Sequence, residues 1–539
     1  MKNPLEIFKQ EATEIQQAYE GVINALIASK VISKTKVMKI MGKVITIIVL
    51  FFLIPSCNIM KKEFANQDSQ AIDSLVSFCY NNDIFNGTIL VAKNDKVIYK
   101  NALGYTNYDL KTKLTINSVF SIASVSKTFT STAILKLQEQ GKLNLNDKLS
   151  KYFPDFPNAE NITIRHLLFH TSGMQNYLVY GGVFRVKDRP GDFIDGVTNV
   201  KAFNYLKTID TLRFQPRERF EYSNSGYLML SLIVEKASGK AFHQFIKDEI
   251  YTPLKMNNSY VISEPNIDIP NRVSGFTNFY TPDDDNLLTT GGGGILTTVE
   301  DLYKWHKGLS LAKNISKETQ KKAFVNITLN DGSLSHNETD TTWCYGMGWV
   351  FRMNEKDSIA FHDGGLNACS AMFYQDLGQD FTIIILSNKG STNANHAIYT
   401  IRDEIIHILK GEQYNFPKVP ISLKMYQLLN NFSLRKAVEK CMLLQENKKN
   451  KFDFSANQLN RLGYHYLQNK EYVKAKAVFE LNIEFYPENA NVYDSYAEAL
   501  MINSENEKAI KYYRKSLRLN PKNENAKNMV QQILKITNN

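Results

Sequence analysis

The chain has 539 residues, of which 43% are hydrophobic and 22% charged, so it is globular rather than disordered and too long for one ordinary domain. Its net charge of +10 comes from 64 Lys and Arg scattered among 54 Asp and Glu, which is typical of a solvated surface and does not predict a nucleic-acid partner. Five cysteines without C-x-x-C spacing argue against a zinc motif, a redox motif and a disulfide framework. We expect two to four domains and neither metal nor cofactor.

Residues 1–37 form an N-terminal extension. They are predicted to form an amphipathic helix and contain no His or Cys. We interpret them either as the remnant of a fused segment or as the product of a start codon placed too early. Met38 and Met41 are the alternative starts.

Residues 38–57 have the three parts of a secretory signal. Lys39 and Lys43 precede an apolar run at 44–54, which is shorter than the roughly 20 residues that span a bilayer, and Cys57 follows. The ending Leu-Ile-Pro-Ser-Cys resembles a bacterial lipobox, which implies cleavage before Cys57 and lipidation of its thiol. The alternative is an uncleaved short anchor. Either way, the expected location is the cell envelope of a bacterium, tethered to the membrane and facing the periplasm or the cell exterior.

The folded body opens with a predicted β-hairpin. Residues 87–92 and 97–100 are rich in β-forming residues, and Asn94 and Asp95 lie in the short turn between them. Two strands joined in this way begin an antiparallel sheet.

Ser124 and Lys127 carry the first chemical signal. Apolar spacing and the stop at Gly141 predict a buried helix with Ser124 in its first turn. Positions i and i+3 share a helix face, so the Lys127 amine can reach the Ser124 hydroxyl. A serine beside a base is an activated nucleophile, although the same spacing recurs three times elsewhere in the chain and is weak alone.

Tyr222 and Asn224 lie in a predicted turn ahead of an apolar helix at 227–234. Two residues apart in a turn, both side chains can point into one cleft, the phenol as a proton shuttle and the amide as a hydrogen-bonding partner.

Two other motifs are more simply explained by packing. His166 and His170 have the spacing of a helical metal pair, but no Glu follows the first His as in zinc peptidases, so we favour helix packing and capping. The glycine run 291–294 lacks the Lys and Ser or Thr of a phosphate-binding loop, so we favour close backbone packing.

The second half of the body is predicted to be an antiparallel sheet covered by a helix at 395–409. Its β-rich runs are residues 345–350, 360–365, 370–374 and 381–387.

Five short motifs, in this order, carry a resemblance: Ser124-Val-Ser-Lys127, His170-Thr-Ser-Gly173, Tyr222-Ser-Asn224, Tyr345-Gly-Met-Gly-Trp349 and His362-Asp-Gly364. Over about residues 80–410 the chain resembles the penicillin-binding and class C β-lactamase-related serine hydrolases. The resemblance implies an α/β (α+β) serine β-lactamase-like fold for residues 58–410, in which an antiparallel sheet is flanked by helices and joined by an all-helical region.

The resemblance also implies roles for single residues. Ser124 would be acylated, and Lys127 and Tyr222 would move its proton. Asn224 would orient Lys127 and the substrate amide. His362 takes the place of the lysine that opens the third motif, as in many esterase and peptidase members. The implied substrate is a small ester, an amide or a peptide.

The substrate-binding edge departs from the family pattern. Backbone N–H groups of Ser124 and Gly365, next to Gly364, would form the oxyanion hole. Asp363 stands where Ser, Thr or Gly is usual, and its charge would repel a free substrate carboxylate, so we expect a preference for neutral esters or amides. The alternative is that Asp363 and Gly364 merely shape a tight turn.

The C-terminal third is predicted to be helical and repetitive. Residues 411–421, which include two prolines, form a linker to an all-α domain at 422–539. Segments 456–489 and 490–523 align at a period of 34 with small residues, an aromatic residue and Pro in register, which are tetratricopeptide-repeat (TPR) signatures. Such a domain would bind a protein or peptide partner, or brace the hydrolase as a rigid support.

Two functions remain open at this point. The first is a secreted, lipid-anchored serine hydrolase that acts through an acyl-Ser124 intermediate as an esterase, a peptidase or a β-lactamase-like enzyme. The second is a non-catalytic ligand-binding or scaffold protein in which the repeats recruit partners. A binding module has no need to keep Ser124, Lys127 and Tyr222 together, which favours the first. Residues 175–210 carry no readable motif and would overhang the cleft.

Overall fold

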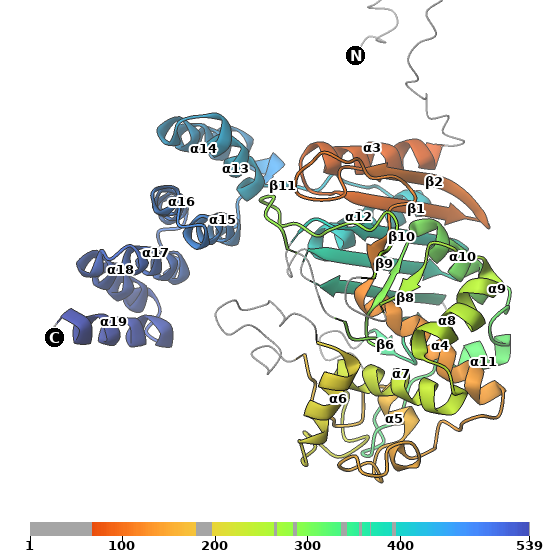
Figure 1. The fold of residues 1–539 in the computed structure, drawn as a ribbon. Helices are drawn as coiled ribbons and strands as arrows, with labels where there is room; N and C mark the ends of the chain where they lie inside the picture. The colour runs from red at the N-terminus through yellow and green to blue at the C-terminus, as the bar shows by residue number, and fades with distance from the viewer. Residues whose placement is uncertain are drawn as a thin grey trace, which may run out of the picture. The chain divides into compact units, whose positions relative to one another are not determined.

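The computed structural model describes residues 67–178, 197–262, 267–283, 288–335, 342–354, 358–366, 368–390 and 395–537 (Figure 1). The N-terminal extension, the signal segment and Cys57 lie outside the described residues, as do residues 179–196 of the segment expected to overhang the cleft. Residues 64–539 form one compact unit.

A seven-stranded antiparallel sheet organises the first part of the chain, with strand order β2-β1-β10-β9-β8-β7-β6. The bounds are β1 Gly87–Lys93, β2 Lys96–Leu103, β6 Cys344–Tyr345, β7 Val350–Met353, β8 Ser358–Leu366, β9 Cys369–Asp376 and β10 Phe381–Ser387. The predicted antiparallel sheet is therefore confirmed, and the first hairpin pairs directly with the last strand.

The hairpin turn forms where the sequence predicts it. Asn94 and Asp95 have φ values of 49° and 63°. Positive φ at both central residues is the requirement of the tight turns that match strand twist, and Asn and Asp tolerate it well. The turn therefore fixes the register between β1 and β2.

The two faces of the sheet are buried against different helices. Helices α3 (Gln67–Asn81) and α12 (Asn395–Lys410) cover one face, as Figure 1 shows, and Ile385 of β10 is buried there. The next residue along the strand, Leu386, is buried in the larger core on the other face. Because successive strand residues point to opposite faces, a strand buried on both sides reads as the continuous apolar run seen in β10.

The larger core is built from helices on the second face. These are α4 (Ser126–Glu139), α5 (Ile164–Leu168), α6 (Asn199–Lys207), α7 (Asn224–Ser238), α8 (Phe242–Ile246), α9 (Thr252–Leu254), α10 (Val299–Ser310) and α11 (Lys317–Lys322). A small sheet of β3 (Phe120–Ser121), β5 (Ile295–Thr297) and β4 (Tyr260–Val261) joins them. Phe129 of α4 stacks on the fully buried Trp305 of α10 with ring centroids 4.3 Å apart, which anchors α4 from within the core.

The C-terminal part is helical, as predicted. Its helices are α13 (Ile421–Asn431), α14 (Leu434–Lys448), α15 (Ala456–Gln468), α16 (Tyr472–Phe485), α17 (Ala490–Ile502), α18 (Asn506–Leu519) and α19 (Glu524–Thr537). Two short strands pair in parallel: β11 (Val419–Pro420) at the end of the linker and β12 (Phe452–Asp453) between α14 and α15.

Two helix pairs recur at a fixed interval. Helix α17 begins 34 residues after α15, and α18 begins 34 residues after α16. A Cβ added to Gly463 would lie 2.5 Å from the Phe479 ring, so a small residue is needed where α15 and α16 touch. The assignment of these helices to the TPR family stays a prediction.

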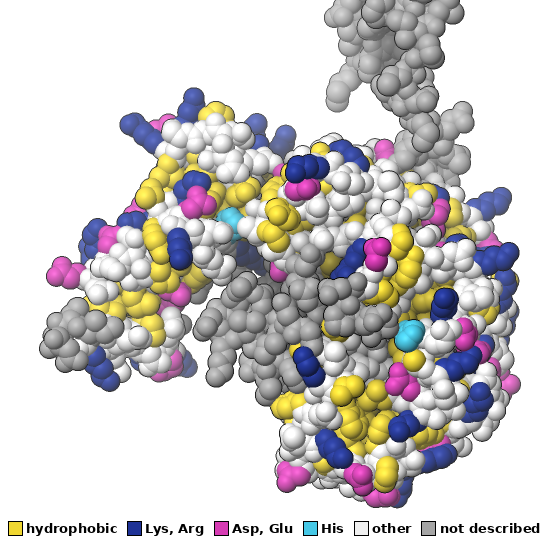
Figure 2. Space-filling model, viewed as in Figure 1, with side chains coloured by type: hydrophobic (Ala, Val, Ile, Leu, Met, Phe, Trp, Pro, Cys, Tyr) yellow, Lys and Arg dark blue, Asp and Glu magenta, His cyan; other side chains and the backbone are white. Residues whose placement is uncertain are grey.

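Charges of both signs are interspersed on the face seen in Figure 2. There the Lys and Arg side chains lie among Asp and Glu and do not merge into a continuous basic stripe. Among the described residues, no helix is both long enough and apolar enough to cross a membrane.

Candidate active site

Ser124 lies at the entrance of α4. The sequence places it in the first α-helical turn, but the structure places it in a 3-10 turn, Ala123–Val125, that leads into α4 at Ser126. Ala123 has a φ of 43°, an uncommon value for a residue with a side chain. The tight turn holds the half-buried Ser124 side chain at the start of the helix.

The Lys127 amine is fully buried and lies among three oxygens. Its Nζ is 3.1 Å from Ser124 Oγ, 2.8 Å from Asn224 Oδ1 and 2.8 Å from the Gly292 carbonyl oxygen. The predicted contact between Lys127 and Ser124 is thus present in the geometry.

Burial lowers the pKa of Lys127 from its ordinary value to about 7, against an opposing pull from the Asp363 charge. A neutral amine has two N–H donors and one lone pair. Because Asn224 Oδ1 and the Gly292 carbonyl accept the two N–H groups, the lone pair is left for the Ser124 hydroxyl. In this state Lys127 is placed as a general base toward Ser124.

The Tyr222 hydroxyl donates to the same serine oxygen, with a distance of 3.0 Å between the two oxygens. Burial raises the pKa of Tyr222 well above its ordinary value, so the phenol keeps its proton. The Lys127 amine lies 4.8 Å from the centroid of the Tyr222 ring. Ser124 Oγ is therefore flanked by a base and by a proton donor.

Asn224 is the first residue of α7 rather than part of a preceding turn. Its backbone N–H donates to Asn176 Oδ1 at 3.3 Å, which helps to hold this end of α7. A Cβ added to Gly292 would lie 3.2 Å from Asn224 Oδ1, so a glycine lets the backbone carbonyl approach the amine. From sequence alone, the glycine run 291–294 predicts only close backbone packing for Gly292 and does not indicate a contact with Lys127.

Gly364 brings β8 against the serine turn. A Cβ at this position would lie 2.2 Å from the Ile122 carbonyl oxygen and 2.9 Å from Ser124 N. Gly364 pairs with Ala371 of β9 within the sheet, so the alternative of a tight turn at Asp363-Gly364 is wrong. Gly365, the expected second oxyanion donor, follows in β8 and is exposed.

His362 is buried and lies on the same face of β8 as Gly364. Its Nδ1 lies 2.6 Å from the Asp363 carbonyl oxygen, which can only accept a hydrogen bond, so Nδ1–H donates and Nε2 accepts from the Tyr345 hydroxyl at 3.2 Å. Burial lowers the pKa of His362 to about 4. Among the described residues it has no hydrogen bond to Ser124, Lys127 or Tyr222.

The Asp363 side chain lies on the opposite face of β8 from His362, toward Tyr399 of α12. Burial raises the pKa of the Tyr399 phenol, and the charge of Asp363 and its hydrogen bond to Tyr399 raise that pKa further. Its charge still acts across the strand, because it opposes the lowering of the Lys127 pKa. Asp363 therefore influences the site through its field rather than by contact with Ser124.

The two histidines with metal-pair spacing have separate roles. His166 Nδ1 accepts from Thr163 N at 3.2 Å in a capping box at the start of α5. His170 lies after the helix and its Nδ1 accepts from Ser223 N. Across the described ranges, no group of three or more His, Cys, Asp or Glu is arranged to hold a metal ion.

Known proteins share sequence similarity with most of the part of the chain that carries Ser124, Lys127 and Tyr222. A model of the family described as Beta-lactamase matches residues 71–406. Penicillin-binding protein 4* of Bacillus subtilis strain 168 is 33% identical over 365 residues, which cover 63% of this chain and 76% of that protein. Protein flp of Staphylococcus aureus strain MW2 is 29% identical over 361 residues, which cover 64% of this chain and 67% of that protein.

Solved structures share the fold. The octameric penicillin-binding protein homologue from Pyrococcus abyssi superposes with a TM-score of 0.54 at 24% identity, covering 67% of this chain and 81% of that one. D-amino acid amidase from Ochrobactrum anthropi SV3, complexed with D-phenylalanine, superposes with a TM-score of 0.55 at 17% identity. The superposition covers 64% of this chain and 99% of the amidase chain. The mixed α/β part of the chain thus has a β-lactamase-like fold, followed by a C-terminal helical region. The chain belongs to the β-lactamase and penicillin-binding-protein family of serine hydrolases.

Proposed function

We propose that this enzyme hydrolyses an ester or an amide, peptides included, through an acyl intermediate on Ser124. The observation that carries the proposal is the position of Ser124 Oγ, which lies 3.1 Å from the Lys127 amine and 3.0 Å from the Tyr222 hydroxyl. A serine becomes a useful nucleophile when a neighbour can remove its proton as it attacks.

Acylation follows from the protonation states of the two neighbours. Neutral Lys127 takes the proton of Ser124 as Oγ bonds to the substrate carbonyl carbon. The oxyanion that forms is stabilised by the backbone N–H groups of Ser124 and Gly365, and losing one such donor typically costs about a hundredfold or more in rate. The close approach of Gly364 to Ser124 N supports this position for the hole.

Tyr222 serves the leaving group. Its phenol donates a proton to the departing oxygen or nitrogen and recovers one from the Lys127 ammonium. Water then attacks the acyl carbon while Lys127 takes one of its protons. Tyr222 gives its proton to Ser124 Oγ as the ester bond breaks, and recovers one from the Lys127 ammonium. Two proton carriers on one serine support both halves of the reaction.

The preferred substrate in this proposal is neutral. His362 stands where a lysine opens the third motif in related enzymes, and its pKa of about 4 leaves it uncharged at neutral pH. The Asp363 carboxylate adds a negative field next to it. Compared with related enzymes, this site lacks the lysine cation of the third motif and has the Asp363 anion beside it, which disfavours a free substrate carboxylate.

The substrate proposal is tested by comparing kcat/KM for p-nitrophenyl esters, neutral amino acid amides and penicillins. A higher value for neutral esters or amides is expected. A higher value for penicillins would overturn the substrate class but not the acyl-enzyme. The alternative of a non-catalytic scaffold is favoured only if no substrate turns over and Ser124 is never acylated.

We also propose that the chain is lipidated on Cys57 and held at the cell envelope. The support is the basic, apolar and Cys-terminated pattern of residues 38–57. Metabolic labelling with an alkyne fatty acid should mark the wild-type chain and leave the Cys57→Ala chain unmarked. Equal labelling of both would contradict the proposal.

The repeated helix pairs are proposed to be TPR units, supported by their 34-residue interval and by the tight contact between Gly463 and Phe479. If they brace the hydrolase, removal of residues 422–539 should lower the melting temperature of the remaining domain. If they recruit a partner, the shortened enzyme should keep both its melting temperature and its kcat.

A further inference from the structure

The buried turn after α5 carries the backbone of the segment that leads to Tyr222. Residues 170–173 are all buried, and two of them have positive φ, 56° at His170 and 72° at Gly173. Three backbone N–H groups of the later segment donate to three carbonyls of this turn: Arg213 to Gly173 at 2.8 Å, Arg217 to Thr171 at 2.9 Å and Glu221 to His170 at 3.0 Å. The turn therefore holds the backbone of residues 213–221 in place through these three hydrogen bonds.

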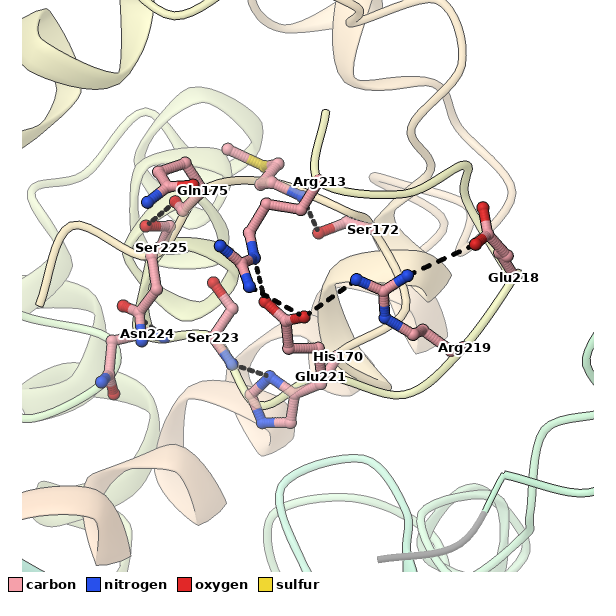
Figure 3. A network of polar contacts seen from close by, with 12 residues as sticks. His170, Ser172, Gln175, Arg213, Glu218, Arg219, Glu221, Ser223, Asn224 and Ser225 are labelled. Carbon is pink, nitrogen blue, oxygen red and sulfur yellow. Dashed lines mark hydrogen bonds and ion pairs between the residues drawn. The ribbon is translucent and has the colours of Figure 1, made fainter. Parts of the chain in front are cut away.

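His170 also holds the backbone that follows Tyr222. Its ring Nδ1 accepts from the Ser223 backbone N–H at 3.1 Å, as Figure 3 shows, while its carbonyl oxygen accepts from Glu221 N. Glu221 and Ser223 are the two chain neighbours of Tyr222. One residue thus holds the backbone on both sides of the tyrosine.

The His170 ring also packs on the tyrosine itself. Its centroid lies 4.4 Å from that of Tyr222, with the planes tilted by 40°, and 4.6 Å from that of Tyr345. Only 1% of His170 is exposed. A close-packed ring of this kind restricts the rotation of Tyr222.

We propose that His170 is a positioning residue that aims the Tyr222 hydroxyl at Ser124 Oγ. The inference rests on the proposed role of Tyr222 in proton transfer. His170 touches no reacting atom, so its effect passes through Tyr222 and appears in kcat rather than in KM. The backbone conformation at His170 is retained despite its φ of 56° because the carbonyl and the ring then reach both neighbours of the tyrosine.

Exposed ion pairs on the same segment provide a matched control. Glu221 accepts from Arg213 and from Arg219, the latter at 3.2 Å, as Figure 3 shows. The Arg219 side chain is 44% exposed, and such pairs contribute little to fixing a structure. Arg219→Gln should therefore change kcat less than about threefold.

The test combines conservative substitutions with a double-mutant cycle. Asn at position 170 offers an acceptor oxygen close to the place of Nδ1 and tolerates positive φ, whereas Leu offers no acceptor. His170→Leu should lose about 10- to 100-fold in kcat at unchanged KM, and His170→Asn, which keeps the acceptor but not the ring packing, should lose several-fold less. In a Tyr222→Phe background, His170→Leu should change kcat by less than about threefold, because the group it positions is gone.

Each outcome bears on the proposal. Equal losses from His170→Leu in the wild-type and Tyr222→Phe backgrounds, or an equal loss from His170→Asn, would overturn it. If the Leu variant does not fold, His170→Gln takes its place in the same cycle, since its longer side chain moves the acceptor away from Ser223 N. Full activity of Tyr222→Phe alone would instead refute the proposed role of Tyr222, which distinguishes the two failures.

Discussion

Gly364 and Ser124 are packed so closely that a Cβ on the glycine would lie 2.9 Å from the serine backbone nitrogen. At Gly364, strand β8 thus meets the serine turn through backbone atoms and the small Cβ of Ala123. The position of Ser124 relative to the sheet depends on this contact, because no flexible side chain separates the turn from the strand.

Replacing Gly364 with Ala should lower kcat by about a hundredfold, because the added Cβ at 2.2 Å from the Ile122 carbonyl must displace the strand from the serine turn. Steady-state kinetics with an ester substrate measures this. Gly378→Ala is the control, since its Cβ would meet atoms at ordinary contact distances of 3.5 Å or more. Equal activity of the two variants would contradict the proposed packing constraint.

The reaction should have an acid limb set by Lys127. Because its pKa is about 7, the neutral amine that can accept a proton predominates above that pH and becomes about tenfold scarcer with each pH unit below it. The value of kcat/KM should rise about tenfold per pH unit below about pH 7 and level off above it. A profile measured from pH 5 to 9 on a neutral ester tests this, and activity that falls as pH rises through 7 would exclude Lys127 as the base.

Asp363→Asn should shift that limb to lower pH. The carboxylate attracts the Lys127 ammonium and so holds its pKa up, and Asn removes the charge while keeping an oxygen for Tyr399. Asp380→Asn, at an exposed turn, is the control and should leave the limb in place. If the pH midpoint of the acid limb is unchanged or higher in Asp363→Asn, the charge of this carboxylate does not raise the pKa of the Lys127 amine.

Much of this arrangement could be predicted from sequence because the chemistry is carried by short local patterns. The spacing of Ser124 and Lys127, the Asn-Asp hairpin turn and the apolar runs of the strands depend on neighbouring residues. The Gly292 carbonyl, which accepts from the amine, could not be predicted, because its contact joins residues 165 positions apart. The orientation of Asp363 toward Tyr399 likewise depends on which face of β8 meets α12.

The folded state should lose stability as the pH falls below about 6.5. Burial lowers the pKa of His170 well below its ordinary value and that of His362 to about 4, so both stay neutral in the folded chain while they gain protons in the unfolded chain. Because the unfolded state then binds more protons, each residue lowers the free energy of unfolding by up to about 1.4 kcal/mol per pH unit across this range.

Urea denaturation at pH 7.5, 6.5 and 5.5 measures this effect. The unfolding free energy should fall between pH 6.5 and 5.5 more steeply than between 7.5 and 6.5, and the slope should decrease in His170→Asn. An unfolding free energy that is constant or rises on acidification would contradict the assignment of buried neutral histidines.

The central claim is that Ser124 is an activated nucleophile, and intact-mass spectrometry of residues 58–539 tests it most directly. The protein is incubated with a fluorophosphonate, and separately with a penicillin, beside Ser124→Ala. A single fluorophosphonate adduct on the wild-type chain that is absent from Ser124→Ala is the predicted result, and the penicillin sample then separates a β-lactam-binding site from an esterase-like one. No adduct from either reagent, or an equal adduct on Ser124→Ala, would contradict the account.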